Sequence, residues 1–317
     1  MILQKRKLFI FLLPLLILML AIPLTAHAAA KVRTVPLSVW EAEPTDNEGW
    51  TWDEHNATLK LSGLNLKVKN AETALALTGD PCTVILEGAN KIVIDGSNSS
   101  LIAIWASDVK FTGSGSLEIT VKNSSGEALG IRAKNLSIDK CSIKINTTSK
   151  KNNSEGVFAS DSLTLNNTKI AVTSTAKYGA IGISSESIQL TGGSINAKCV
   201  SSSGESFGIM SQDDIKLTNC QTNIAVKAKK EFAAALWGKG EIVIGGGKTV
   251  LAGQTYAAIS NTGIKLNKVT GSKGEVVAYG EQGDGGKLYC FAKKGSSEKL
   301  EWKGDALVGR CTDITIK

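Results

Sequence analysis

The sequence of 317 residues predicts an all-β protein: a right-handed parallel β-helix with three short strands in each coil, about nine coils, and a cap at either end. Three observations predict this fold. An alternating apolar phrase recurs every 22 to 27 residues, a turn residue such as Gly or Asn follows it, and no segment shows a helical period. A repeat of this length indicates a solenoid, in which each unit buries its apolar face by stacking on its neighbours.

The repeated phrase is clearest between Leu163 and Lys227, where it reads LTLNNTKIAVTS, IQLTGGSINAKC and IKLTNCQTNIAV. Residues two apart on a strand point to the same side, so each phrase begins with an inward apolar pair. We call the first member of this pair the anchor, and the nine anchors are Leu59, Val84, Val109, Leu136, Leu163, Ile188, Ile215, Ile242 and Ile264. The residue two positions after every anchor is also apolar, which predicts nine stacked strands.

The chain opens with a predicted secretory signal peptide over residues 1–28. A basic start, Lys5-Arg6-Lys7, precedes an apolar run, and Ala26-His27-Ala28 forms a small-x-small cleavage site. A membrane anchor is the alternative, but the small-x-small end and the polar sequence after it favour cleavage. We therefore expect a secreted, extracellular protein without a membrane span in its mature form, and association with the cell surface is left open.

Non-repetitive segments flank the repeats. Residues 29–57 contain Trp40 and the cluster GWTWD (Gly49 to Asp53), and they are predicted to form an N-terminal cap. The open end of a stack must be covered, so Trp50 and Trp52 are expected to lie over the first coil, with ligand binding as the alternative. The β-helix is predicted to span residues 58–270, and residues 271–317 are predicted to form the C-terminal coils and cap.

Two further strands follow the anchor strand in each coil. The second carries apolar pairs such as Ile143/Ile145 and Ile170/Val172. Counting back five residues from the next anchor predicts the inward residues of the third strand: Ile104, Ile131, Phe158, Ile183, Met210, Trp237 and Ile259. Trp237 is then expected to enlarge the core, and the usual preference of parallel crossovers predicts a right-handed coil. A leucine-rich repeat, the alternative for this period, requires an L-x-x-L-x-L-x-x-N phrase that is missing.

Charge and cysteines limit the function classes. The net charge of +7 falls to +4 without the three basic residues of the signal peptide, which is too weak and dispersed to indicate nucleic-acid binding. Cys141 and Cys220 occupy the same place three coils apart, about 14 Å, beyond the roughly 7 Å limit for a disulfide. Cys199 is expected to be buried, so Cys290 and Cys311 are the pair left free to bond.

The repeats resemble the pectin-lyase-like parallel β-helices. With the signal peptide and the GWTWD opening followed by ATLKLSGLNL, the chain is similar to secreted bacterial carbohydrate-binding β-helix proteins of the clostridial, polygalacturonate-binding type. The resemblance covers about Trp50 to Gly271. It implies binding of acidic plant polysaccharide without cleavage, with calcium ions on the helix. The expected partner is therefore an extracellular polysaccharide, and the oligomeric state is left open.

The residues offer little for catalysis. A polysaccharide lyase uses Arg or Lys to abstract a proton, but only Arg33, Arg132 and Arg310 follow the signal peptide, and the R-x-P-x-x-R phrase of pectate lyases is missing. A polygalacturonase needs suitably spaced carboxylates and a nearby His, whereas His55 lies in the predicted cap. A lyase or hydrolase of this superfamily is therefore the alternative to a binder, and a structural surface solenoid or adhesin is a third class.

Acidic residues recur just before the anchors and form the predicted calcium site: Asp108, Asp161, Glu186, Asp213 and Asp214. Three of them stand two residues before an anchor in consecutive coils, so stacking would bring like charges to about 5 Å. Calcium, which takes carboxylate and carbonyl oxygens, would neutralise them. The alternative is that each acid forms its own turn and points into water.

Trp105 and Arg132 form the predicted polysaccharide-binding site. Both stand four residues before an anchor in adjacent coils, which predicts outward side chains on the third strand. An exposed indole can stack on a sugar ring, and an adjacent guanidinium can pair with a uronic carboxylate. Small residues nearby, Ala103, Gly130, Ala180 and Gly182, are expected to leave a flat strip around them. The alternative is a Trp105 covered by loop 122–127, or one that only forms a cation–π pair with Arg132.

Overall fold

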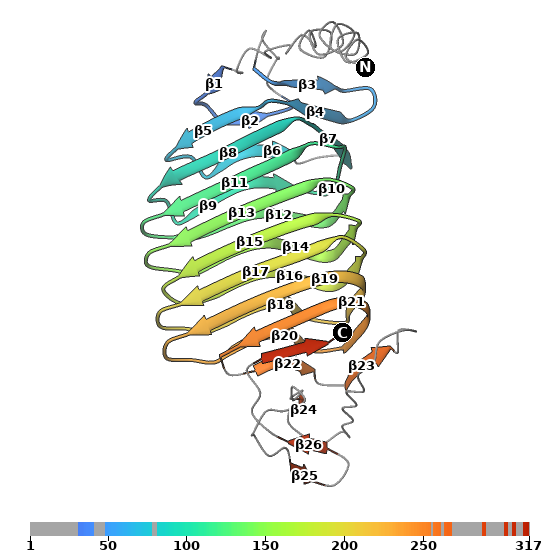
Figure 1. Cartoon of the computed structure of the whole chain (residues 1–317). Helices are drawn as coiled ribbons and strands as arrows, with labels where there is room; N and C mark the ends of the chain where they lie inside the picture. Colours follow the sequence, from blue (N-terminus) through green and yellow to red (C-terminus); the bar gives the residue numbers. More distant parts are fainter. Residues whose placement is uncertain are drawn as a thin grey trace, which may run out of the picture.

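The computed structural model describes residues 31–40, 48–77, 81–254, 256–260, 263–267, 287–289, 301–303, 306–308 and 313–316. Their strands stack into a parallel β-solenoid of about seven turns, with three parallel sheets running along its length (Figure 1). The prediction of an all-β parallel β-helix is therefore confirmed. Residues of the predicted signal peptide, together with Cys290 and Cys311, lie outside the described residues.

Sheet 1 contains the anchor strands. Its members are β4 (Thr58–Ser62), β7 (Cys82–Glu87), β10 (Asp108–Thr112), the second halves of β12 (Glu127–Asp139), β14 (Ser154–Asn166) and β16 (Ala180–Thr191), the first halves of β19 (Ile215–Ala228) and β21 (Glu241–Gly253), and β23 (Gly263–Asn267).

Sheet 2 follows sheet 1 in every turn, and its long strands run side by side in Figure 1. It contains β1 (Val32–Arg33), β5 (Asn65–Lys69), β8 (Ala89–Gly96), β11 (Ser116–Asn123), β13 (Ser142–Ser149), β15 (Lys169–Ala176), β17 (Ser194–Ser201) and the second halves of β19 and β21.

Sheet 3 completes each turn. It contains β2 (Leu37–Ser38), β6 (Thr73–Leu77), β9 (Ser100–Ala106), the first halves of β12, β14 and β16, and then β18 (Ser206–Ser211), β20 (Ala233–Gly238) and β22 (Tyr256–Ser260).

The number of turns differs from the predicted nine. All nine anchor strands exist, but those at the ends are not enclosed by parallel neighbours. β4 is covered on one side by the antiparallel β3 (Trp50–Asp53), and β21 is the parallel partner recorded for β23 among the described residues. Seven anchor strands have a parallel neighbour on both sides, which agrees with about seven turns.

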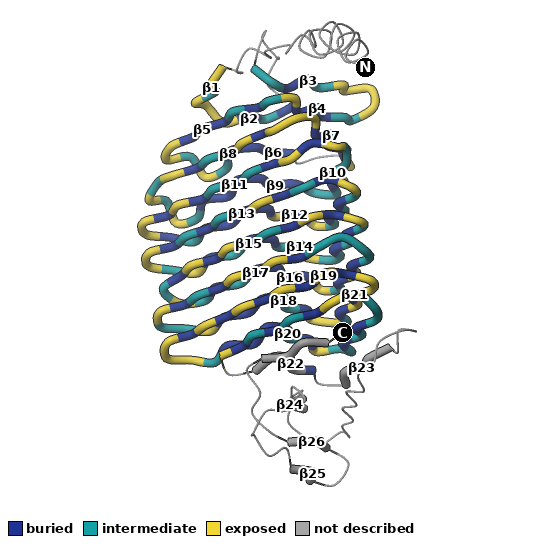
Figure 2. Tube along the Cα trace, in the orientation of Figure 1, coloured by how far each residue is buried: buried dark blue, intermediate teal, exposed yellow. Residues whose placement is uncertain are grey.

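The interior is filled by the alternating apolar residues of sheets 1 and 2, as predicted (Figure 2). The register differs from the predicted alignment of the anchors between β7 and β10. There, the partner of Val84 is Phe111, and the partner of Val109 is Cys82. This shift of two residues leaves the same face inward, so the core is unaffected. Cys82, Cys141, Cys199 and Cys220 are all buried free thiols, and burial raises the pKa of Cys82 and Cys141 to about 11.

The predicted inward row of sheet 3 is confirmed at Ile104, Ile131 and Ile183. It is wrong at Phe158, Met210 and Trp237. The buried column instead contains Ile104, Ile131, Val157, Ile183, Ile209 and Leu236, which pair in this order. The corner between sheets 3 and 1 varies in length: Val157 precedes its anchor by six residues, whereas Ile131 precedes its anchor by five. Trp237 therefore lies in the outward row and does not enlarge the core.

The small residues of sheet 3 also face the interior, contrary to expectation. Ala103 and Ala180 are fully buried. A Cβ atom on Gly130 would lie 2.5 Å from Cγ2 of Ile145, which belongs to sheet 2. These residues do not form an outer strip. They let the backbone of sheet 3 approach the side chains of sheet 2.

Further strands lie at the two ends of the solenoid. At the N-terminal end, Trp50 of β3 is 2% exposed and donates a hydrogen bond from Nε1 to Glu48 (3.0 Å), while Trp40 packs edge-on against Trp52 (4.8 Å). At the other end, β27 (Asp313–Ile316) and β24 (Lys287–Tyr289) pair antiparallel with β21 and β22, and β25 (Glu301–Lys303) forms a hairpin with β26 (Ala306–Val308). Among the described residues, no helix has the length and hydrophobicity to span a bilayer.

Candidate functional site

The outward side chains give the three sheets different chemistry. Sheet 1 presents acids, lysines and hydroxyl groups, and sheet 2 presents mainly lysines and small polar residues. Sheet 3 presents aromatic and aliphatic residues together with Arg132, Glu127 and Glu155. Strands of parallel solenoids stack about 4.8 Å apart, so a polymer lying along any face meets equivalent positions turn after turn. Sheets 1 and 3 hold the residues predicted as binding sites.

Sheet 3 brings the predicted pair together. Trp105 and Arg132 are register partners on adjacent strands, and both are exposed, Trp105 by 47%. Register pairing extends this outward row to Phe158, Ser184, Met210 and Trp237. The row therefore continues past the two predicted residues along the solenoid.

Arg132 makes a cation–π contact with Phe158, whereas the contact considered from the sequence was one with Trp105. Its guanidinium carbon lies 5.7 Å from the ring centroid of Phe158. Phe158 therefore supports the guanidinium from the next turn, on the side away from Trp105. An indole and a guanidinium placed side by side can contact a sugar ring and its carboxylate at the same time.

Glu155 is a residue of this face that the sequence reasoning missed. It lies in a second outward row, next to Leu129 and Ile181, and accepts a hydrogen bond from Ser184 Oγ. Burial raises the pKa of Glu155 to about 7, although the Ser184 hydrogen bond and Arg132 favour the charged form; the Glu127 carboxylate adds to the rise. The sequence could have indicated Glu155, because it is a Glu at a position where neighbouring turns have apolar residues. This comparison requires the correct register of sheet 3, which the sequence pattern did not provide.

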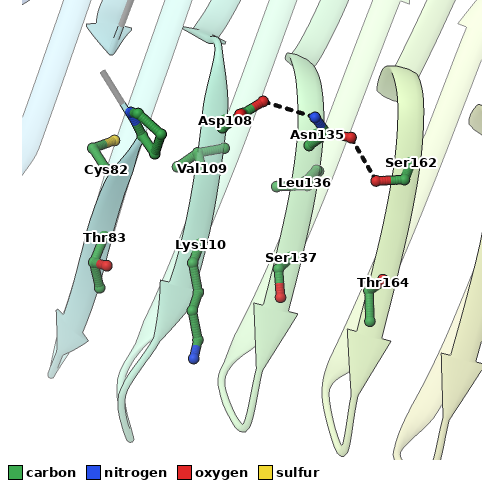
Figure 3. A pocket seen from close by; sticks show the side chains of 11 residues that line it. Cys82, Thr83, Asp108, Val109, Lys110, Asn135, Leu136, Ser137, Ser162 and Thr164 are labelled. Carbon is green, nitrogen blue, oxygen red and sulfur yellow. Dashed lines mark hydrogen bonds between the residues drawn. The ribbon is translucent and has the colours of Figure 1, made fainter. Parts of the chain in front are cut away.

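Sheet 1 carries a shallow hollow of about 310 Å³ across β7, β10, β12 and β14 (Figure 3). Asn135 bridges two turns at its rim: its Nδ2 donates to Asp108 (2.8 Å), and its Oδ1 accepts a hydrogen bond from Ser162 (2.6 Å). Below them, Thr83, Lys110, Ser137 and Thr164 form a row of register partners. The lining mixes these polar groups with apolar residues such as Pro81, Val109 and Leu136.

The predicted calcium residues lie at or near the corner between sheets 3 and 1. Three of these acids each contact a different polar or basic side chain. Asp108 pairs with Asn135, Asp161 lies 3.8 Å from Lys134, and Asp214 lies 3.2 Å from Lys216. Asp214 also accepts a hydrogen bond from the backbone N–H of Glu241.

Glu186 and Asp213 are neighbours on successive turns, since the Asp213 N–H donates to the Glu186 carbonyl (2.7 Å). The described residues hold no group of three His, Cys, Asp or Glu placed to bind a metal ion. The five acids therefore do not form one carboxylate site, and calcium binding stays a prediction.

Comparisons with known proteins do not assign a function to this site. No family model matches the chain, and no curated protein or solved structure matches it either. The β-solenoid is consistent with the pectin-lyase-like architecture.

Proposed function

We propose that this chain is a secreted, non-catalytic carbohydrate-binding protein for acidic extracellular polysaccharide. The observation that carries the proposal is the exposed Trp105 beside Arg132, with Phe158 packed under the guanidinium. A strand face with an indole beside a guanidinium offers stacking for the apolar side of a sugar and an ion pair for its carboxylate. The predicted signal peptide and the resemblance to clostridial polygalacturonate-binding proteins support the same function.

Trp105→Ala tests the proposal. We expect the variant to bind polygalacturonate about tenfold or more weakly than the parent, because a stacked aromatic and the area it buries are lost. Arg132→Gln should weaken binding of the acidic polymer but leave binding of its methyl ester nearly unchanged. Affinity electrophoresis and calorimetry on the secreted form measure both effects.

Trp40→Ala is the matched control, because Trp40 is also an exposed indole but lies in the N-terminal segment. Circular dichroism and thermal unfolding verify that each variant is folded. Full polysaccharide binding by the folded Trp105→Ala protein would refute this site, and no glycan binding by the parent would favour a structural surface solenoid. A chelator arm tests the predicted dependence on calcium: if calcium takes part, chelation should weaken binding.

A lyase or hydrolase is the second candidate, and Glu155 is the observation that favours it. A carboxyl group whose pKa lies near 7 can exchange a proton at neutral pH, and it lies close to Arg132 on the same face. Incubation with polygalacturonate, followed by assays for unsaturated products and reducing ends, separates the two candidates. Products that disappear in Glu155→Gln would establish an enzyme, whereas binding without products supports the binder.

A further inference from the structure

We propose that the outer face of sheet 2 is a second binding surface, and that its ligand is a polysaccharide rich in carboxylates. This inference rests on the proposed function in taking the ligand to be a polysaccharide. Beyond the proposed function, it assigns a separate face of the solenoid and predicts that the contacts there are ion pairs between lysines and the carboxylates of the polymer. Its residues are not those of sheet 3.

The face is built by the outward positions of eight successive strands, from β5 to β21. They carry nine lysines and two acids, and every one of these lysines is exposed. Lys67, Lys122, Lys169, Lys198 and Lys227 show that they extend over the whole length of the solenoid. Since the mature chain is expected to carry a net charge of only +4, positive charge is concentrated on this side.

The two acids neutralise little of this charge. Glu118 lies between two lysines in register and forms ion pairs with both, 3.3 Å from Lys91 and 3.0 Å from Lys144. Asp95 lies between Lys69 and Lys122 in register. Among the described residues of this face, the recorded ion pairs are those of Glu118, so most of the lysines remain available to an anionic ligand.

The geometry suits an extended polymer. Successive strands are about 4.8 Å apart, so a chain lying across them meets a new strand at roughly the spacing of a sugar unit. Thr120, Asn146 and Thr173 are register partners between the lysine-bearing positions, and they can hydrogen-bond to sugar hydroxyl groups. Charge repeated along a flat surface, with hydroxyl and amide groups between, fits a polymer with regularly spaced carboxylates.

Carboxylates fit this face better than phosphates do. The described outward residues of β5 to β21 on sheet 2 include no Arg, the side chain that binds phosphate oxygens in a bidentate manner. Nor does this flat sheet project a helix or ribbon toward a nucleic-acid groove. Lysine acts as a point charge, which is sufficient for a carboxylate on each sugar.

The test is a fourfold variant, Lys122→Gln, Lys169→Gln, Lys198→Gln and Lys227→Gln, compared with a control that removes the same charge elsewhere. Lys31, Lys151, Lys230 and Lys239, all exposed and outside the strands of the three sheets, supply the control when each is changed to Gln. We expect the sheet 2 variant to bind polygalacturonate about tenfold more weakly, since each exposed charge contributes a small amount. The control should stay within about twofold of the parent.

Salt and competitors complete the experiment. Binding of the parent to polygalacturonate should weaken as sodium chloride rises, and this salt dependence should be smaller in the sheet 2 variant. Equal losses in the two fourfold variants, or no salt dependence in the parent, would overturn the inference. Preferential binding of duplex DNA or anionic vesicles over polygalacturonate would overturn it as well.

The sheet 3 variants separate this inference from the proposed function. If Trp105→Ala retains full binding while the sheet 2 variant loses it, the sheet 3 site is wrong and the sheet 2 surface stands. If the sheet 2 variant binds like the parent while Trp105→Ala does not, the sheet 2 surface is wrong. Binding of neutral and acidic polymers with equal affinity would also contradict the sheet 2 surface.

Discussion

Lys140 occupies a backbone conformation that other turns give to Gly or Asn. The corner between sheets 1 and 2 contains one or two residues with positive φ in each turn. They are Gly63 (91°), Gly88 (61°), Gly113 (110°), Lys140 (57°), Asn167 (50°), Gly192 (65°), Gly193 (71°), Asn219 (54°), Gly246 (73°) and Gly247 (73°). The predicted role of Gly and Asn after the anchor strand is therefore confirmed. Lys140 is the exception, because its Cβ crowds the backbone in this region.

We expect Lys140→Gly to stabilise the protein by roughly 0.5–1 kcal/mol. Relief of the left-handed strain exceeds the extra entropy that Gly gives to the unfolded chain. Urea unfolding of the secreted form measures the effect. Lys122→Gly, at an exposed position within β11, is the control and should instead destabilise by about 0.5–1 kcal/mol. A destabilised Lys140→Gly protein would show that the Lys side chain makes a contact worth more than the strain.

Glu155 makes stability depend on pH. The pKa of its carboxyl group is about 7 in the folded state and 4.5 in the reference state, so the folded chain binds the extra proton. Its contribution is therefore full below about pH 4.5 and is lost as the pH rises through about 7.

Glu155→Gln, which stays neutral, should raise stability at pH 8 more than at pH 5, by roughly 2 kcal/mol. Denaturant unfolding at the two pH values measures this difference. Glu118→Gln is the control, because lysines on either side lower the pKa of Glu118. A gain from Glu155→Gln that is equal at both pH values would mean that Glu155 is not protonated in the folded state.

At the scale of the elements, a column of glycines sets how closely sheet 3 approaches sheet 2. A Cβ atom on Gly156 would lie 2.2 Å from Cγ1 of Val172 and 2.6 Å from the carbonyl oxygen of Gly182. One contact is with a side chain of sheet 2 and the other with the backbone of the next turn. An added methyl group must therefore move two elements, not one side chain.

Gly156→Ala is expected to destabilise the solenoid by about 1–3 kcal/mol, the usual cost of overpacking. Gly179→Ala is the comparison, because the nearest neighbour of the added Cβ is the side-chain oxygen of the exposed Asn153, at 3.1 Å, and not backbone or a core side chain. We expect it to change stability by less than about 0.5 kcal/mol. Thermal and denaturant unfolding of the two variants test this difference, and equal effects would show that the sheets tolerate a wider spacing.

Sequence patterns predicted the inward residues of sheets 1 and 2 well, but those of sheet 3 only in part: Ile104, Ile131 and Ile183 are correct. Strict alternation identifies the inward residues of the first two sheets, because their outward positions are mostly polar. Sheet 3 has apolar residues on both sides, so Phe158 and Met210 read equally well as core in the wrong register. The corner before sheet 1 differs by one residue between turns, and no sequence pattern marks this difference. Trp105 and Arg132 were placed correctly because, in their two turns, the inward residue of sheet 3 precedes the next anchor by five residues, as the prediction assumed.

At the scale of the whole molecule, one backbone path supports three faces of different chemistry. Only the interior is constrained by packing, so the outward residues of each sheet are free to vary. Sheet 3 gathers aromatic residues, sheet 2 gathers lysines, and sheet 1 holds a shallow hollow with a mixed polar and apolar lining. The repeat predicted the stack, but the chemistry of a face depends on residues from distant segments and becomes visible only when the turns are aligned.

The claim that sheet 3 binds acidic polysaccharide is tested most directly by a structure of the protein with a uronate hexasaccharide. We predict a sugar ring stacked on the indole of Trp105 and its carboxylate paired with the guanidinium of Arg132. A hexasaccharide bound at another place, with no contact to Trp105 or Arg132, would contradict this account.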